Sequence, residues 1–388
     1  MTVINRDPSP RPPASGTMGQ LLRYFLALGT FGFGGPIALA GYMQRDLVER
    51  RGWITKKDYV DGLALAQLAP GPLAAQLAIY LGWSKGGVAG ATGVAAAFIL
   101  PSFLMVMVLS ALYVRFGGLP WMQCAFYGIG AAVIAIIARS AWKLVKMSLG
   151  KDRLLWALFA ASAVTTAWTE SEIIWLFLGS GVVVLLARAR RRSATPLAAA
   201  LPPGLLLGLS AAAAWPLLGR IAFYFAEAGS FVFGSGLAIV PFLHGGVVNQ
   251  FHWLSERQFL DAVAVAMITP GPVVITVAFI GYLVAGPLGA CFAALGVFLP
   301  CYLFVIIPAP YFRRFADNQK VRAFVDGVTA AATGAIGGAA FVLGRRALVD
   351  WKTIAIAVTT WLVFTRFKKV PEPLVIAAAG VIGLLVHR

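Results

Sequence analysis

LAPGP at residues 68–72 and ITPGP at residues 268–272 are two copies of one helix-breaking stretch, and each lies inside an apolar segment. Proline lacks the backbone donor of a helix and clashes with the preceding turn, while glycine reaches backbone angles that other residues avoid. A regular α-helix therefore cannot run through either stretch. Two such breaks at an offset of 200 residues predict two related halves, each with interrupted helices.

The repeat extends well beyond these two stretches. At the same offset Phe31, Phe33, Gly34, Ala38, Trp53 and Asp61 correspond to Phe231, Phe233, Gly234, Ala238, Trp253 and Asp261. After a slip of one residue the pairs are Gly82 with Gly281, Gly87 with Gly286, Gly90 with Gly289, Pro101 with Pro300, and Gly128 with Gly327. Apolar composition alone does not place Trp, Asp and Pro-Gly-Pro in one register. We infer an internal duplication.

The composition predicts a membrane protein. Of the 388 residues 60% are hydrophobic and 12% are charged, whereas soluble domains have roughly 45–50% apolar and about 25% charged residues. Backbone polar groups inside a bilayer need internal partners, which helices provide. The expected fold class is therefore an all-α polytopic membrane protein.

An apolar helix needs about 20 residues to cross the hydrocarbon core. Candidate segments are 21–42, 61–82, 88–114, 123–145, 154–168, 173–187, 201–218, 221–243, 261–283, 287–308, 324–344, 352–365 and 372–386. The regions 154–187 and 352–386 are short enough to form hairpins, so the sequence predicts about 10 to 13 spans. The expected division is a cytoplasmic tail at 1–19, a first repeat at 20–192, a linker at 193–219 and a second repeat at 220–388.

The apolar stretch 201–218 has no counterpart in the first half, and one extra crossing there would invert the second half relative to the first. Loop charge supports this topology. Basic clusters at 143–153, 188–192, 313–322 and 366–369 would face the cytoplasm, as the positive-inside rule requires, whereas the cluster at 45–57 would not. Inverted repeats are common in secondary transporters, which bind substrate where the repeats meet.

The formal net charge of +17 fits these basic loops. Binding to nucleic acid is disfavoured because the basic residues lie in short clusters between apolar stretches rather than on one folded face. Three cysteines and three histidines show no ligand spacing, so we expect no metal and no cofactor. The chain also shows no clustered acid, base or nucleophile typical of an enzyme.

The interrupted helices predict an anion site. A helix that restarts inside the membrane exposes N–H groups and the positive end of its dipole. The expected substrate-binding residues are Gly34, Gly35, Pro36, Gln67, Pro70, Gly71, Pro72, Gly234, Ser235, Gly236, Thr269, Pro270, Gly271 and Pro272, with Gln76 and Thr276 nearby. The alternative is that the glycines allow close helix packing and that the polar side chains bond between helices.

Four ionisable residues are candidates for coupling or charge pairing. Asp61 and Asp261 occupy equivalent positions, Arg139 lies near the middle of a span, and Arg45 is a candidate partner for an acid. Intramembrane charge is usually functional. The competing interpretations are a favourable charge at a helix N-terminus for the aspartates and a snorkelling side chain for Arg139.

Several stretches resemble the bacterial chromate ion transporter family in its long, two-domain form. They are FGFGGPIALAGYMQRDLVERRGWI (31–54), LAPGP (68–72), FGSGLAIVPF (233–242), DAVAVAMITPGPVV (261–274) and FLPCYLF (298–304). The resemblance implies a multi-pass carrier of the bacterial inner (plasma) membrane that exports chromate and confers chromate resistance. It also implies sulfate as a similar anion. This chain has Leu39 where the family pattern often has His, so proton coupling through that His does not carry over.

The predicted mechanism is alternating access driven by the membrane potential or an ion gradient. One alternative is a carrier of sulfate or another oxyanion that runs inward. Two others belong to different classes, namely an intramembrane enzyme and a non-transporting scaffold, and the scaffold would leave the paired breaks without a purpose. The expected partners are the lipid bilayer and, as one alternative, a second copy of the chain in a homodimer.

Overall fold

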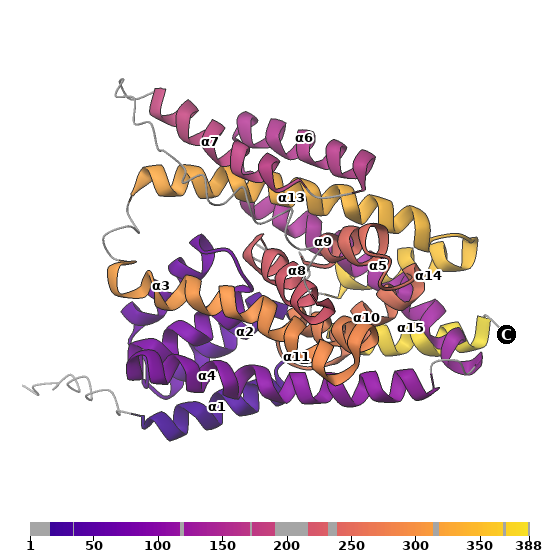
Figure 1. The fold of residues 1–388 in the computed structure, drawn as a ribbon, viewed down its shortest axis with the longest axis horizontal. Coiled ribbons are helices and arrows are strands. Elements are labelled where there is room, and N and C mark those ends of the chain that lie inside the picture. Colours follow the sequence, from indigo (N-terminus) through magenta and orange to yellow (C-terminus); the bar gives the residue numbers. More distant parts are fainter. Residues whose placement is uncertain are drawn as a thin grey trace, which may run out of the picture.

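The computed structural model describes residues 16–33, 35–116, 120–170, 173–190, 216–231, 239–312, 318–367 and 370–386. Within these ranges the regular structure is helical and no strand occurs (Figure 1). The prediction of an all-α fold is confirmed. Of the predicted linker stretch 201–218, residues 201–215 lie outside the described residues, and α8 begins at Leu217.

The two halves repeat the same order of short and long helices. The first half contains α1 Met18–Phe31, α2 Gly35–Met43, η1 Gln44–Arg50, α3 Lys56–Leu68, α4 Leu73–Phe116, α5 Pro120–Ser148, α6 Arg153–Thr169 and α7 Ile174–Arg190. The second half contains α8 Leu217–Phe231, α9 Ile239–His244, η5 Gly245–Gln250, α10 Glu256–Ile268, η6 Val273–Ile275, α11 Thr276–Ile306, η7 Ala309–Tyr311, α13 Gln319–Ala347, α14 Trp351–Arg366 and α15 Glu372–Val386.

The long helices α4 and α11 are each folded at one point. Gly87 has φ +58° in α4 and Gly286 has φ +64° in α11, and the backbone leaves helical angles at both places. A Cβ on Gly82 would lie 2.5 Å from the carbonyl oxygen of Gly90, although eight residues of straight helix span about 12 Å. Residues 73–85 of α4, the short arm, therefore turn back onto residues 88–116, the long arm.

The chain also turns back at the first Pro-Gly-Pro. The helix α3 ends at Leu68 and α4 begins at Leu73, and a Cβ on Gly62 would collide with the ring of Tyr80. Gly62 and Tyr80 lie well away from the break on either side, so they meet only if α3 and α4 pack against each other. The prediction that a single membrane-crossing helix is interrupted at this motif is therefore not confirmed. The break instead forms the tip of a helical hairpin.

The first glycine motif has the same form. The helix α1 ends at Phe31 and α2 begins at Gly35. A Cβ on Gly16, just before α1, would collide with the indole of Trp53, which follows η1. The segment from α2 to Trp53 therefore returns along α1, and this motif also lies at a hairpin tip.

These reversals affect the number of spans. By length and composition, four helical stretches among the described residues are suited to cross a membrane: Leu73–Phe116, Trp121–Lys146, Val273–Tyr311 and Gln319–Ala347. Two shorter apolar stretches are Trp175–Ala189 and Glu372–Val386. The prediction of 10 to 13 spans is not confirmed, since segments such as 61–82 are divided between two short helices.

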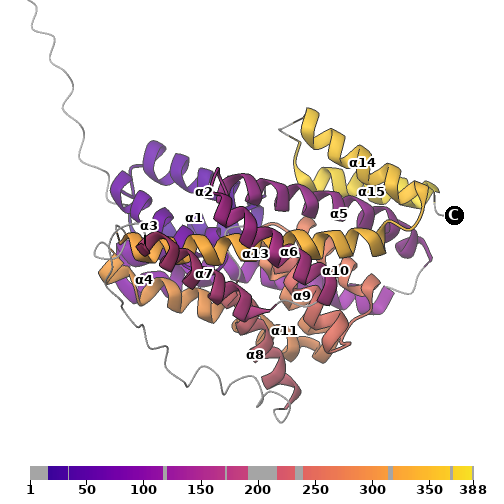
Figure 2. The same cartoon turned by 90° about the horizontal axis from the view of Figure 1, so that it is seen from above.

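Glycines pack the helices closely. A Cβ on Gly29 of α1 would collide with the Phe98 carbonyl of α4, and in the second half a Cβ on Gly229 of α8 would lie 2.7 Å from the Val297 carbonyl of α11. Figure 1 shows α13 beside α6 and α7, and Figures 1 and 2 show α14 and α15 beside α5 at the end where the C-terminus lies. The close-packing interpretation of glycine thus holds at these positions.

Asp350 caps α14 and ties it to α5. Its carboxylate accepts a hydrogen bond from the backbone N–H of Thr353 at 2.7 Å and another from the hydroxyl of Tyr127. The N–H of Thr353 is the main cause that lowers the pKa of Asp350 to about 2, and the Tyr127 hydroxyl adds to it.

We expect Asp350→Ala to lower the free energy of unfolding by about 1 kcal/mol, the usual cost of losing an N-cap. The folded-state pKa is depressed, so this contribution is fully present above the ordinary value of 3.8 and is lost as pH falls toward 2. Thermal unfolding in detergent, near neutral pH and near pH 2, measures it. A difference between variant and wild type that persists unchanged near pH 2 would contradict the prediction.

Candidate functional site

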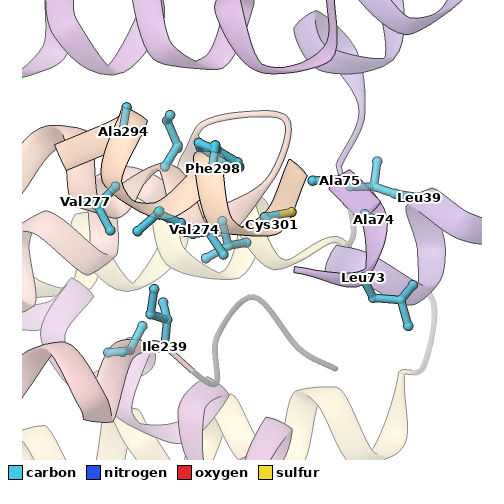
Figure 3. Packing of buried hydrophobic residues seen from close by; sticks show 14 of the residues in the cluster. Leu39, Leu73, Ala74, Ala75, Ile239, Val274, Val277, Ala294, Phe298 and Cys301 are labelled. Atoms are coloured by element: carbon cyan, nitrogen blue, oxygen red, sulfur yellow. The ribbon is translucent and has the colours of Figure 1, made fainter. Parts of the chain in front are cut away.

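A small cavity lies where the hairpin tips of the two halves meet. Its lining is apolar side chain and backbone: Gly35, Pro36, Leu39, Pro72, Ala74, Gly271, Pro272, Val273 and Val274. Figure 3 shows Leu39 and Ala74 together on one side, and Val274 further along the same packed cluster. The cavity volume is about 10 Å³, which is at the lower limit for one water molecule. The structure is therefore closed around this point.

Three helix N-termini converge on the cavity, those of α2, α4 and η6, which continues into α11. In α4 the backbone N–H of Gln76 donates to Pro72 O at 3.0 Å, and in η6 that of Ile275 donates to Pro272 O at 3.0 Å. The N–H groups before these positions have no acceptor within their own helix. With the positive ends of the helix dipoles they form a site suited to an anion.

Glycine is required at the tips. The φ angles of Gly35, Gly71 and Gly271 are +72°, +134° and +100°, a region that residues with a Cβ rarely adopt. The N–H of Gly271 donates to the carbonyl of Gly32 at 2.8 Å. A backbone hydrogen bond therefore joins the Pro-Gly-Pro tip of the second half to the glycine tip of the first.

Each Pro-Gly-Pro tip also packs against the long helix of the opposite half. A Cβ on Gly271 would collide with the hydroxyl of Ser102 in α4, and a Cβ on Gly71 would lie 3.5 Å from the Cβ of Cys301 in α11. Ser102 follows Pro101 and Cys301 follows Pro300, so the two side chains occupy equivalent positions of the repeat. The contacts between the tips and the long helices of the two halves are therefore reciprocal.

Comparison with known proteins identifies the family. A sequence profile described as chromate transporter matches residues 19–185 and 219–384, which is most of the chain in two copies. The chain belongs to the chromate transporter family. It is therefore a multi-pass membrane protein of a transporter family with two repeated halves, and the resemblance found in its motifs is confirmed.

Three curated relatives of this chromate transporter family member match over nearly their full length. A chromate transport protein of Cupriavidus metallidurans is 58% identical over 98% of both chains, and a probable chromate transport protein of Synechococcus elongatus is 54% identical over 95% of both. A chromate transport protein of Pseudomonas aeruginosa is 32% identical over 97% of this chain and 93% of its own. No solved structure matches the chain.

The structure brings together some of the substrate-binding residues predicted for the transporter. Gly35, Pro36, Pro72, Gly271 and Pro272 line the cavity. Pro70 and Gly71 form the rest of the first Pro-Gly-Pro tip, and Thr269 and Pro270 precede Gly271. Gly34, Gly234, Ser235 and Gly236 lie outside the described residues. The role of all of them in substrate binding stays a prediction.

The predicted polar side chains are exposed or donate hydrogen bonds within the protein. Gln67 is exposed at the end of α3. The hydroxyl of Thr269 donates to Val265 O at 2.7 Å, and that of Thr276 donates to Val273 O at 2.8 Å. The Gln76 amide nitrogen donates to Pro70 O at 2.6 Å. Only Gln76 of the four therefore bonds to a residue of a Pro-Gly-Pro tip, and none of the four lines the cavity.

The four ionisable candidates of the transporter lie away from the cavity lining. Asp261 is 4% exposed and accepts a hydrogen bond from the Tyr113 hydroxyl at 2.7 Å, and Asp61 is half-buried in α3. The guanidinium of Arg139 lies 4.7 Å from the ring centre of Phe364 in α14. Arg45 is exposed and pairs with Asp46 at 3.2 Å. Their roles in coupling stay predictions.

Sequence reasoning missed several residues at this site. Ala74, Val273 and Val274 line the cavity, and each looks like ordinary apolar core in the sequence. Leu39 also lines it, although the sequence singles it out only as a departure from the family pattern. Ser102 and Cys301 had a usable signal. The Pro101 and Pro300 pair of the repeat places them at equivalent positions, directly after a proline in the third apolar segment of each half.

Proposed function

We propose that this chain exports chromate from the cytoplasm as a secondary carrier of the bacterial inner membrane, and that chromate binds where the hairpin tips of the two halves meet. The observation that carries the proposal is the convergence of three helix N-termini on one cavity whose described lining has no charged side chain. The names of the curated relatives supply the substrate.

The chemistry of the tips suits a tetrahedral dianion. Each helix N-terminus carries roughly half a positive charge, so three of them offset most of the charge of chromate without a Lys or Arg. Backbone N–H groups donate to the oxygens of the anion. A site built in this way releases its ligand more readily than one that holds it with buried cations, which is useful in a carrier.

The closed cavity favours alternating access. It is too small for an oxyanion, so the tips have to separate before chromate enters, and the hydrogen bond from Gly271 to Gly32 has to break. We propose that residues 20–192 and 220–388 move as the two halves and open the tips to one side of the membrane at a time.

Sulfate or a similar oxyanion is the second candidate substrate. Chromate and sulfate share their shape and charge, and a lining of backbone and apolar atoms has few means to distinguish them. We therefore expect sulfate to compete with chromate at the same site.

Reconstitution tests the proposal. Purified protein in liposomes loaded with chromate is expected to release it faster than protein-free liposomes do, and external sulfate is expected to slow the uptake of chromate in the opposite arrangement. The chromate absorbance of the separated liposomes gives both rates. Folded, reconstituted protein that moves no chromate above the protein-free rate would refute the function.

A further inference from the structure

Ser102 is a buried hydroxyl in direct contact with the second Pro-Gly-Pro tip. It lies on the long arm of α4 and is 0% exposed. Its hydroxyl donates to the carbonyl of Gly29 at 3.1 Å. The hydroxyl oxygen of Ser102 also fills the space that a Cβ on Gly271 would occupy. Two donors, the Ser102 hydroxyl and the Gly271 N–H, thus lie side by side although they come from opposite halves.

Both donors form hydrogen bonds to carbonyl groups at the C-terminal end of α1. The Ser102 hydroxyl donates to Gly29 O, and the Gly271 N–H donates to Gly32 O just beyond the end of the helix. Carbonyl groups at a helix C-terminus carry the negative end of the dipole. In the closed state these carbonyls therefore occupy the positions that the oxygens of an anion would take.

The bond from Ser102 is unusual for a serine inside a helix. Such a hydroxyl commonly bonds to the carbonyl four residues earlier in its own helix, and Ser110 of α4 does so with Val106 O at 2.7 Å. Ser102 reaches across to α1 instead. Its donor can consequently change partner when α1 moves, while the helix that carries it stays intact.

We propose that Ser102 is a ligand of the transported oxyanion. When the tips separate, the Ser102 hydroxyl and the Gly271 N–H leave the carbonyls of α1 and donate to two oxygens of the anion. This inference rests on the proposed function and adds to it a side chain that contacts substrate.

The equivalent residue in the other half makes the site asymmetric. Cys301 is fully buried beside Gly71, and a thiol is a much weaker donor than a hydroxyl. Of these two equivalent side chains, only Ser102 therefore offers the anion a strong hydrogen-bond donor. Affinity depends on Ser102 more than on Cys301.

The test compares Ser102→Ala with Ser110→Ala in proteoliposomes, with chromate as the probe. Ser110 is a matched control, because it is equally buried in the same helix and loses the same hydroxyl but bonds only within α4. A hydrogen bond to a charged group is strong, so we expect the KM for chromate to rise roughly tenfold to a hundredfold in Ser102→Ala. Ser110→Ala keeps the KM of the wild type.

A merely structural role gives a different result. If Ser102 only holds α1 against α4, its loss changes the maximal rate or the thermal stability and leaves the KM unchanged, which overturns the proposal. Should the alanine variant not fold, Ser102→Cys retains the size of the side chain with a weak donor, and its KM is expected to rise as well. Wild-type protein that transports no chromate refutes the proposed function itself, a result distinct from equal KM values in active variants.

Discussion

Gly271→Ala is expected to abolish chromate transport while the protein still folds and inserts. At φ +100° alanine is strained by about 1–3 kcal/mol. The added Cβ would collide with the Ser102 hydroxyl and lie 3.2 Å from the carbonyl oxygen of Gly29. The tip has to move away from α1 and α4, so the donors of the two halves no longer meet at one point.

Gly87→Ala is the matched control. Gly87 also has a positive φ, +58°, but a Cβ there meets nothing within 4 Å. Alanine at Gly87 thus reproduces the backbone strain without the collision at the tips. Chromate flux in proteoliposomes, normalised to folded protein, measures both variants. Transport by Gly271→Ala at the level of Gly87→Ala would show that the tips are not the site.

A membrane potential of 100 mV, negative inside, is expected to hold the concentration of chromate outside more than a thousandfold above that inside. Moving one charge through 100 mV is worth about 2.3 kcal/mol, so a dianion gains about 4.6 kcal/mol, or slightly more than three factors of ten. The described cavity lining contains no acidic residue that would bind a compensating proton. We therefore expect transport to carry the full charge of the anion, and export to need no ATP.

The measurement is the steady-state ratio of chromate outside to inside liposomes at a series of imposed potentials. Potassium gradients with valinomycin set the potential, and Gly271→Ala liposomes report the passive leak. The logarithm of the ratio is expected to rise linearly, by about three decades per 100 mV. A ratio that is independent of the potential would mean that transport is electroneutral, by cotransport of cations or exchange of anions, and would refute uncoupled export.

The positions of the tips were predictable from the sequence, but the course of the chain was not. Proline and glycine determine where a helix ends, and Pro70 to Pro72 and Pro270 to Pro272 lie at such ends. They do not determine the direction in which the next helix leaves. That direction depends on tertiary packing such as the contact between Gly62 and Tyr80. A straight crossing and a hairpin therefore look alike in the sequence.

Side-chain roles at the site were harder to predict for the same reason. Gln76 was a candidate donor to the anion, but its partner in the closed state is the carbonyl of Pro70. Arg139 is a candidate because it is charged within an apolar segment, yet its neighbour Phe364 lies on a helix far along the chain. Only the fold shows which residues distant in sequence share one place.

The reciprocal packing of Ser102 on Gly271 and of Cys301 on Gly71 has a consequence for how such a molecule is assembled. Each half supplies a side chain that packs on the tip of the other half. A chain of half the length would lack these contacts and would have to associate with a second chain to restore them. In this protein one chain contains both halves, so the partner is always present, and the two equivalent positions carry different side chains, a hydroxyl at Ser102 and a thiol at Cys301.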